Sequence, residues 1–286
     1  MKTNILGGII LSAMTVNSFA ADKPYFSYPV GRIEVHMLVE TQGPGNPSIL
    51  INPDRAAIDR YIPGGTYTSA VNTFLIKTPD RIIVVDTGFG GAIFSSMKAL
   101  GFDPAQVDAV LITHMHGDHI NGLQKDGQAL FPKARVYLAQ QEKDFWIKPG
   151  ASTAGNSAAA ALAPYGNRVE TFRPGELGTV IADLIPGIKP IAAFGHTPGH
   201  TAFMVESEGK KLLIWGDLMH VQLIQFPVPG QSVSFDTEPV AAAAIRRQIL
   251  EYAAQNKIPI AGMHLVYPAI GTVAADGSGY RFTPAE

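Results

Sequence analysis

The chain has 286 residues and carries 22 Lys and Arg against 24 Asp and Glu, so its formal net charge is −2. This near balance argues against a nucleic-acid binder, which normally presents a basic face to phosphates. The absence of cysteine excludes disulfides, thiolate zinc sites and cysteine nucleophiles, so any metal must be held by histidine and carboxylate. Hydrophobic residues make up 46% and charged residues 16%, which predicts a folded chain with a large buried core.

The first twenty residues have the pattern of a secretory signal peptide. Lys2 supplies a positive start, residues 5–16 form an apolar run, and Ser18-Phe19-Ala20 is a small-x-small cleavage pattern. An uncleaved anchor is the alternative, but the apolar run is short of the ~20 residues that span a bilayer. We therefore expect residues 21–286 to form a single domain that is periplasmic or secreted, with no stable membrane insertion after cleavage.

Hydrophobic periodicity predicts the elements in chain order. Strands are expected at residues 31–41, 71–76, 81–85, 107–113, 134–139, 188–194, 201–207, 211–215 and 258–263. Helices are expected at 92–100, 140–147, 157–163 and 237–255, the last with an apolar face of Val240, Ala244, Ile245, Ile249 and Tyr252. Residues 42–65 are expected to form a long loop, and residues 148–163 an insertion or lid. This alternation predicts an α/β or α+β fold class with a sandwich of sheets.

A first histidine cluster follows the buried strand at 107–113. His114 and His116 are two residues apart, so on extended backbone they point the same way and can clasp one ion. Gly117 lets the chain turn, after which Asp118 and His119 can face a second ion. Imidazole and carboxylate together suit zinc, iron or manganese, so the cluster predicts a metal site.

A second cluster, Gly195-His196-Thr197-Pro198-Gly199-His200-Thr201, lies between two predicted strands. Its glycines and proline are typical of a rigid turn. We expect His200, after the turn, to be a metal ligand. His196, at the turn entry, is expected to be structural or to support a ligand.

Two later residues complete the series of candidate ligands. Asp217 follows the apolar strand at 211–215, where a carboxylate is well placed to bridge two ions. His264 follows the strand at 258–263. Each is a weak signal alone, but both extend the pattern of polar residues at strand ends.

The series His114-x-His116-x-Asp118-His119, His200, Asp217 and His264 resembles, in order and spacing, the metal-binding motifs of the metallo-β-lactamase superfamily. Val85-Asp86-Thr87-Gly88 is similar to a motif at the end of an early strand in that superfamily. The resemblance runs from about residue 71 to the C-terminus. A narrower likeness, to the methyl parathion hydrolase branch beside the acyl-homoserine lactonases, rests on Asp144-Phe145-Trp146, the second histidine cluster, Gly216-Asp217-Leu218, Gln225-Phe226 and Gly279-Tyr280-Arg281-Phe282.

The resemblance implies a four-layer αβ/βα sandwich with two divalent metal ions at the sheet edges. Zinc is the first expectation, and manganese, iron and cobalt stay open. One ion would be held by His114, His116 and His200, and the other by Asp118, His119 and His264, with Asp217 bridging. Asp86 would lie outside the ligand set and fix the tautomer of a ligand histidine, although a simple turn cap is the alternative.

The resemblance further implies a hydrolase in which a metal-bridging hydroxide attacks a carbonyl carbon or a phosphorus, with Asp118 holding or accepting the proton. A bridging Asp217 favours hydrolases of lactones, esters, thioesters and phosphate esters, because β-lactamases of the superfamily typically carry Cys or Ser at this position. We expect a small, neutral, hydrophobic lactone or ester as substrate. Phosphotriesters such as methyl parathion are a further candidate substrate class.

His220 departs from both relatives, since the position three after the bridging aspartate is Tyr in acyl-homoserine lactonases and apolar in the parathion hydrolase branch. Here a histidine could donate a proton to the leaving alkoxide or stabilise the oxyanion. A pocket-lining or surface histidine is the alternative. Trp146 and Phe226 are expected to be pocket walls by likeness, with ordinary core packing as the alternative for each.

Other functions stay open at the level of sequence. These are a metallo-β-lactamase and a catalytically inactive metal-binding protein of the same fold, although the intact ligand set counts against the latter. No basic cluster suits a phosphate monoester or glutathione, which disfavours a glyoxalase II activity. No nucleic-acid partner is expected, and a homodimer is one option by analogy alone.

Overall fold

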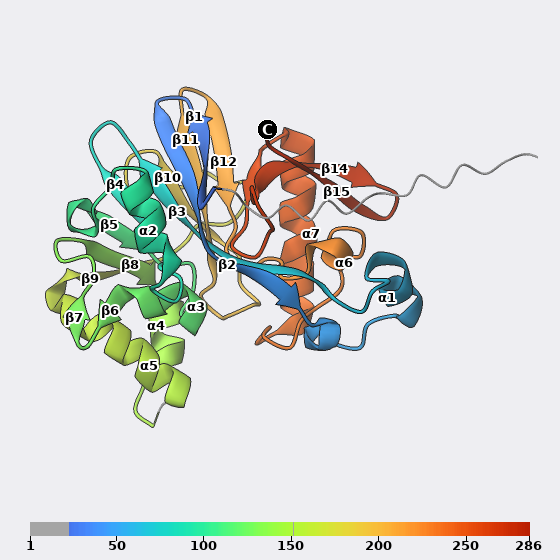
Figure 1. The fold of residues 1–286 in the computed structure, drawn as a ribbon, viewed down its shortest axis with the longest axis horizontal. Coiled ribbons are helices and arrows are strands. Elements are labelled where there is room, and N and C mark those ends of the chain that lie inside the picture. Colours follow the sequence, from blue (N-terminus) through green and yellow to red (C-terminus); the bar gives the residue numbers. More distant parts are fainter. Residues whose placement is uncertain (1–22, 151) are drawn as a thin grey trace, which may run out of the picture.

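The computed structural model describes residues 23–150 and 152–286, so the predicted signal peptide lies outside the described residues. Within them, two sheets pack face to face and helices cover the outer faces (Figure 1). Helices α2 (Ala92–Ala99), α4 (Gln140–Trp146) and α5 (Thr153–Leu162) lie on the first sheet, and α7 (Pro239–Asn256) lies on the second. This is the αβ/βα four-layer sandwich that the resemblance implies.

The first sheet has the strand order β1-β2-β3-β4-β5-β8-β9 among the described residues. Strands β1 to β4 pair antiparallel, whereas β4, β5, β8 and β9 run parallel. Its strands are β1 (Tyr25–Val30), β2 (Ile33–Gly45), β3 (Tyr67–Lys77), β4 (Ile82–Val85), β5 (Ala109–Leu111), β8 (Arg135–Ala139) and β9 (Val169–Phe172).

The second sheet has the order β10-β11-β12-β13-β14-β15 and is antiparallel except for the parallel pair of β12 and β13. Its strands are β10 (Ile188–Ala192), β11 (Thr201–Ser207), β12 (Lys210–Ile214), β13 (Ile260–Ala261), β14 (Ile270–Asp276) and β15 (Gly279–Pro284). Each sheet thus contains parallel neighbours, and the carboxyl ends of parallel strands meet at one edge of a sheet. Most candidate ligands come after β5, β12 and β13, so this topology gathers them, whereas His196 and His200 lie in the turn between the antiparallel strands β10 and β11.

Shorter elements connect the layers. They are β6 (Gln124–Lys125) and β7 (Gln128–Ala129), which form a hairpin, the helices α1 (Arg55–Tyr61), α3 (Gly117–Ile120) and α6 (Gln222–Gln225), and 3-10 turns at Pro47–Ile49, Pro104–Gln106, Asn121–Leu123 and Ala163–Arg168.

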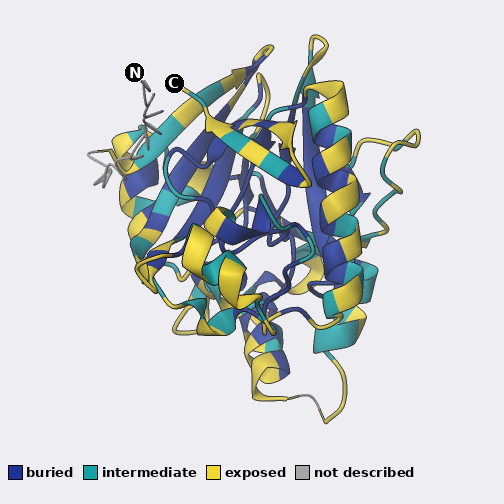
Figure 2. Cartoon of the chain, turned by 90° about the vertical axis from the view of Figure 1, so that its right-hand side faces the viewer, coloured by how far each residue is buried: buried dark blue, intermediate teal, exposed yellow. Residues whose placement is uncertain are grey.

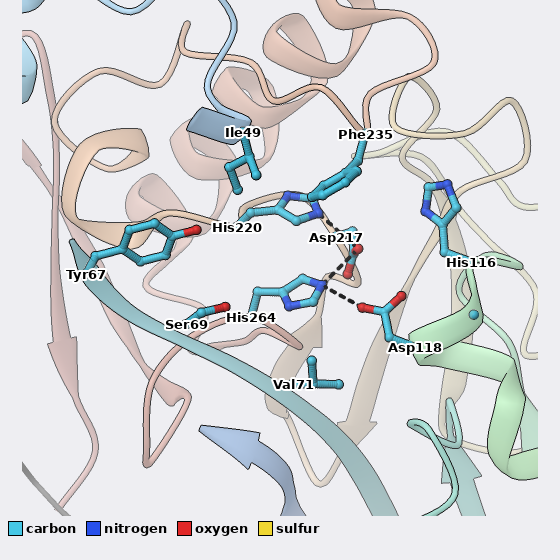
Figure 3. Close-up of a pocket in the computed structure, with 11 residues that line it drawn as sticks. Ile49, Tyr67, Ser69, Val71, His116, Asp118, Asp217, His220, Phe235 and His264 are labelled. Atoms are coloured by element: carbon cyan, nitrogen blue, oxygen red, sulfur yellow. Dashed lines mark hydrogen bonds and ion pairs between the residues drawn. The ribbon is translucent and has the colours of Figure 1, made fainter. Parts of the chain in front are cut away.

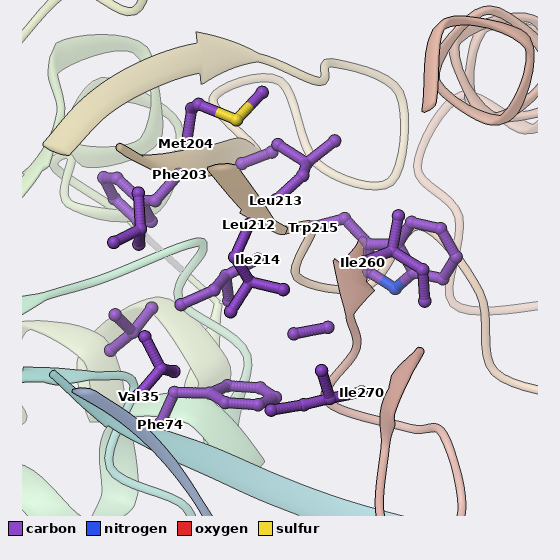
Figure 4. Packing of buried hydrophobic residues seen from close by; sticks show 14 of the residues in the cluster. Val35, Phe74, Phe203, Met204, Leu212, Leu213, Ile214, Trp215, Ile260 and Ile270 are labelled. Atoms are coloured by element: carbon purple, nitrogen blue, oxygen red, sulfur yellow. The ribbon is translucent and has the colours of Figure 1, made fainter. Parts of the chain in front are cut away.

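The largest apolar cluster fills the space between the two sheets (Figure 4). Phe74 of β3 and Phe203 of β11 enter it from opposite sheets, and both are fully buried. Burial of each such side chain contributes about 1.5–3 kcal/mol. Figure 2 shows the same division, with buried residues along the strands and exposed residues on the outer sides of the helices. The inner cluster therefore fixes the two sheet edges relative to each other.

Three expectations about local structure are corrected. Residues 42–65 are not one long loop, because β2 continues to Gly45 and α1 forms behind Asp54, whose carboxylate accepts from Ala56 N. The described part of the stretch 148–163, residues 148–150 and 152–163, is not a lid, because α5 packs into the cluster under the first sheet and none of these residues lines the pocket at the sheet edges. On α7, Val240 is 87% exposed and Ala244 is exposed, and the buried face is Ala242, Ala243, Arg246, Ile249, Leu250 and Ala253.

Candidate metal centre

A pocket of about 360 Å³ opens at the edge where the ligand-bearing strands of the two sheets end. Polar side chains from both sheets form its floor, and apolar side chains from β3, the 3-10 turn at Pro47–Ile49 and the segment before α7 form its rim (Figure 3). The lining residues are Ile49, Tyr67, Ser69, Val71, His116, Gly117, Asp118, Asp217, His220, Phe235 and His264. Among these lining residues there is no Lys or Arg, so the pocket offers no fixed cation to an anionic substrate.

Three imidazole nitrogens meet at one point beside this pocket. His114 Nε2 lies 2.9 Å from His116 Nδ1 and 3.2 Å from His196 Nε2, and the last two atoms are 3.0 Å apart. Ligands at 2.0–2.1 Å from a tetrahedral zinc ion are separated by about 3.3 Å, so the spacing fits a single shared cation. Together with Asp217 these residues form one group that could hold a metal ion.

A second group is formed by Asp118, His119 and His264. His264 Nε2 lies 3.5 Å from Asp118 Oδ2, and His119 Nε2 lies 3.6 Å from the same oxygen. Asp118 is the most open member, with a side chain 25% exposed at the pocket floor. One carboxylate and two imidazoles are again a ligand set that suits zinc and similar ions.

Asp217 lies between the two groups. Its Oδ1 is 3.2 Å from His119 Nε2, whereas its Oδ2 is 3.0 Å from His264 Nε2 and 3.4 Å from His196 Nε2. Burial alone would raise the pKa of Asp217, but the surrounding imidazoles, His119 foremost, hold it well below its ordinary value. The carboxylate is therefore ionised and placed to contact a cation in either group.

The ring nitrogens that face away from the centre are held by fixed acceptors. His119 Nδ1 lies 2.8 Å from Asp86 Oδ2, and His264 Nδ1 lies 2.7 Å from the carbonyl of Ala70. Such contacts leave the Nε2 lone pairs aimed at the centre. Asp86 is fully buried and also accepts from Thr113 N and Oγ1, at 2.8 and 2.7 Å. The arrangement agrees with the orienting role expected of Asp86.

The uncharged histidine rings of the first group favour binding of a metal cation. Burial lowers the pKa of His116 to about 4 and that of His196 to about 3, so at neutral pH both rings are uncharged and offer lone pairs. Lone pairs about 3 Å apart repel unless a cation lies among them. Where Asp217 meets the second group, the buried atoms His119 Nε2 and Asp217 Oδ1 form an ion pair at 3.2 Å, and neither makes a hydrogen bond among the described residues. Both observations fit divalent metal ions.

Comparison with known proteins agrees with this geometry. A sequence model of the metallo-β-lactamase superfamily matches residues 66–253. The chain belongs to this superfamily. Among solved structures, a hydrolase of the beta-lactamase superfamily, AbOPH, is 29% identical, covers 92% of this chain and 98% of its own, and superposes with a TM-score of 0.84. A dizinc quorum-quenching lactonase, AidC, solved with the product N-hexanoyl-L-homoserine, covers 92% and 97% at 24% identity and a TM-score of 0.83, which shows the shared fold.

Curated relatives of this superfamily match over shorter stretches. The exodeoxyribonuclease WalJ of Streptococcus pneumoniae is 32% identical over 89 residues, which is 29% of this chain and only 33% of that protein. An N-acyl homoserine lactonase of Bacillus cereus is 22% identical over 193 residues, 56% of this chain and 68% of that protein. The predicted superfamily is therefore confirmed, and its known members carry out different reactions.

Within this superfamily fold, the prediction for His200 is wrong. Its Nδ1 lies 2.8 Å from the carbonyl of Ala193, and its Nε2 accepts from Asp217 N at 2.9 Å, so both nitrogens already have backbone partners. His200 thus holds the backbone of Asp217, and His196 takes the place among the grouped nitrogens. The turn from Gly195 to Gly199 decides which histidine points inward, and spacing along the sequence does not reveal it.

The remaining predicted residues divide between pocket and core. His220 lines the pocket, with its Nε2 3.2 Å from Asp217 Oδ2 and its ring stacked on His264 at 4.6 Å. Phe226 is a core residue, 4% exposed and stacked on Phe282 at 5.3 Å, so its prediction as a pocket wall is wrong. Trp146 does not line the pocket either, although its ring meets His116 edge-on at 5.3 Å. Trp146, the last residue of α4, packs against the cluster under the first sheet, and Phe226, directly after α6, belongs to the cluster between the sheets.

Glu142 is a residue that sequence reasoning missed. It is buried on α4, where Oε1 accepts from Met115 N at 2.9 Å and Trp146 Nε1 at 2.6 Å. Its Oε2 accepts from Thr197 Oγ1 at 2.7 Å and Gly199 N at 3.0 Å. One carboxylate therefore joins the two histidine-bearing turns. An acidic residue in the first turn of a helix after a buried strand is the only sequence signal, and it is common at exposed positions too.

Proposed function

We propose that this protein is a metal-dependent hydrolase of neutral lactones or esters. The observation that carries the proposal is the pair of histidine and carboxylate groups at the floor of a pocket with an apolar rim. Asp217 belongs to the first group and lies 3.2 Å from His119 and 3.0 Å from His264 of the second. Lactonases among the structural neighbours support the same substrate class.

We assign one ion to His114, His116 and His196 and the other to Asp118, His119 and His264, with Asp217 between them. When bound, divalent ions in such a site supply Lewis acidity and lower the pKa of water toward neutrality. Zinc is the first candidate on the donor set, and manganese, iron and cobalt suit it as well.

The pocket residues act on substrate in distinct ways. Asp118, the half-buried carboxylate of the floor, accepts a proton from the attacking water. His220 faces the pocket from the opposite side of Asp217 and donates a proton to the leaving oxygen or a hydrogen bond to the developing oxyanion. Ile49, Val71 and Phe235 contact the apolar part of the substrate. The absence of Lys and Arg from the described lining favours uncharged substrates.

The test is a substrate screen of the protein loaded with zinc, manganese or cobalt. Acyl-homoserine lactones, aryl esters, phosphotriesters such as methyl parathion, and a chromogenic cephalosporin are assayed side by side. We expect the highest kcat/KM on lactones or esters, lost in chelator and regained with metal. A higher kcat/KM on the cephalosporin would overturn the substrate class, and no metal-dependent turnover of any compound would overturn the enzyme.

The role of His220 has its own test. His220→Ala should lower kcat for lactones by about 10²–10⁴-fold, the usual contribution of a general acid, because their alkoxide leaving group needs a proton. Nitrophenyl esters should lose far less, because their leaving group departs without protonation. Steady-state kinetics on both classes measures the difference, and equal losses would remove the acid role.

We further propose that the chain is exported. The support is the basic, apolar and small-residue pattern of residues 1–20. Among residues 23–150 and 152–286, no helix is long and apolar enough to cross a membrane. Mass spectrometry of the mature protein recovered from the periplasm or medium should give a start at Ala21. Recovery of an intact N-terminus in the cytoplasm would contradict export.

A further inference from the structure

Arg246 is a fully buried cation on α7, and its hydrogen bonds and ion pair among the described residues go to one segment of the chain. Its Nε donates to the carbonyl of Leu218 at 2.5 Å, and its Nη1 donates to the carbonyls of Pro229 and Gln231 at 3.0 and 2.8 Å. Its Nη2 lies 3.7 Å from Asp236 Oδ2. These four partners lie in residues 218–236, which we call the pocket-wall segment because it also carries the pocket residues His220 and Phe235.

Burying the charged guanidinium of Arg246 costs desolvation free energy that an apolar side chain of similar volume would not cost. A buried ion pair usually stabilises no more than apolar residues of similar volume. Burial lowers the pKa of Arg246 to about 10, so the group still carries its charge at neutral pH. What an apolar side chain does not supply is the planar fork of donors. That fork donates to three buried carbonyls of irregular backbone, and the carbonyl of Gln231 also accepts from Gln225 Nε2 at 2.9 Å.

The last residue of the pocket-wall segment, Asp236, contacts the metal centre. Asp236 Oδ1 lies 2.9 Å from His196 Nδ1, and Asp236 Oδ2 accepts from Val233 N at 3.0 Å. The contact with Asp236 keeps the proton of His196 on Nδ1 and aims Nε2 at His114 and His116. The neighbouring backbone adds a bond from Thr237 N to the carbonyl of His196 at 2.9 Å.

We propose that Arg246 is a positioning residue that holds His196 at the metal centre through Asp236 and fixes the pocket wall through the same segment. The inference rests on the ion assignment under the proposed function. Loss of the guanidinium frees the carbonyls of the segment and lets Asp236 move, so His196 loses its fixed orientation. The ion assigned to His114, His116 and His196 is then held more weakly, whereas the ion assigned to Asp118, His119 and His264 is not affected.

The test compares Arg246→Met with Arg247→Met in the full mature chain. Arg247 is the next residue of α7 and is exposed, and its guanidinium lies beside Gly230 of the same segment. It therefore controls for loss of a cation next to the segment without loss of the carbonyl contacts that Arg246 makes. Zinc titration against a chromophoric chelator gives two dissociation constants. We expect Arg246→Met to weaken one site by about 10–100-fold, as loss of an outer partner of a ligand typically does, and to leave the other within error. Arg247→Met should match the unmodified protein at both sites.

A second measurement does not depend on metal. In ¹H–¹⁵N spectra of histidine, the Nδ1 proton of His196 should exchange slowly in the unmodified protein and in Arg247→Met, and rapidly in Arg246→Met. If Arg246→Met does not fold, Arg246→Lys and Asp236→Asn replace it, since the first keeps the charge without the fork and the second removes the charge that faces Arg246. Folded variants with unchanged zinc affinities and an unchanged His196 proton would overturn the proposal. If the unmodified protein binds no zinc, the proposed function fails, and the His196 proton still decides the role of Arg246.

Discussion

Three of the histidines at the centre present one ring nitrogen to it and give the other to a fixed acceptor. Asp236 serves His196, Asp86 serves His119, and the carbonyl of Ala70 serves His264. His200 differs because its second nitrogen accepts from Asp217 N instead of facing an ion. At the scale of single residues, a histidine near the centre can therefore bind a metal ion only if one of its ring nitrogens faces the centre and has no backbone partner. The presence of a histidine in the motif does not decide this.

The pair His196 and His200 gives a direct test of this distinction. His196→Gln should leave the purified protein with about one metal ion per chain rather than about two, because a neutral amide is a poor substitute for imidazole. His200→Gln should retain about two, because its amide oxygen can still accept from Asp217 N. Elemental analysis after gel filtration measures both. The reverse pattern would restore His200 as the ligand.

At the scale of elements, the site depends on the residues that come directly after each strand. After β5 the chain passes through His114 and His116 into α3, after β13 it reaches His264, and after β12 it turns at Gly216 to present Asp217. Gly216 has φ +61°, and a Cβ there would lie 2.4 Å from His200 Nε2. Both the backbone conformation and the space therefore call for glycine at the end of β12.

Gly216→Ala should lower the free energy of unfolding by more than the cost of placing an alanine in a left-handed backbone conformation. Gly277 has nearly the same φ, +60°, but a Cβ there would meet nothing within 4 Å, so Gly277→Ala measures the conformational cost of about 1–2 kcal/mol. Gly216→Ala should cost this amount plus the displacement of His200, and should also weaken metal binding through Asp217. Urea unfolding of metal-free protein and zinc titration check the two effects. Equal unfolding free energies for the two variants would contradict the close contact with His200.

At the scale of the whole molecule, the apolar cluster between the sheets sets the distance between two halves of the metal centre. Asp118 and His119 belong to the first sheet's side, whereas Asp217 and His264 come after strands of the second sheet. Cations shared between the sheets would therefore act as a cross-link as well as a source of chemistry. Folding and metal binding should be thermodynamically coupled.

Removal of metal should accordingly lower the melting temperature. A ligand at a thousand times its Kd stabilises by about 4 kcal/mol. For a domain of this size that is on the order of 10 °C in Tm. Calorimetry of the protein before chelator, after chelator and after return of zinc measures the shift. A Tm that does not respond to either step would show that the histidine and carboxylate groups hold no ion.

The sequence by itself determined the strand-end pattern of polar residues, the superfamily and most strands of both sheets, because these depend on local periodicity and short spacings. Even there it missed the hairpin of β14 and β15, although Asp276-Gly277 is a common turn signal. Among the described residues, the groups that could hold a metal ion contain eight residues, and six of them were named from the sequence as candidate ligands, since His114 to His119 are neighbours in the chain and Asp217 and His264 each come after an apolar strand. The other two are His196 and His220, for which the sequence predicted other roles.

Only the tertiary structure decided the rest. Which histidine of the 195–201 turn faces the centre depends on contacts with Asp217 and Asp236, which lie far away in the chain, as well as on the carbonyl of Ala193 just before the turn. Likewise Phe226 lies in the core, and Arg246 and Glu142 join distant turns, because packing of α7 and α4 sets their surroundings. A side chain's direction at a turn is fixed by partners far away in sequence, and local spacing carries no record of them.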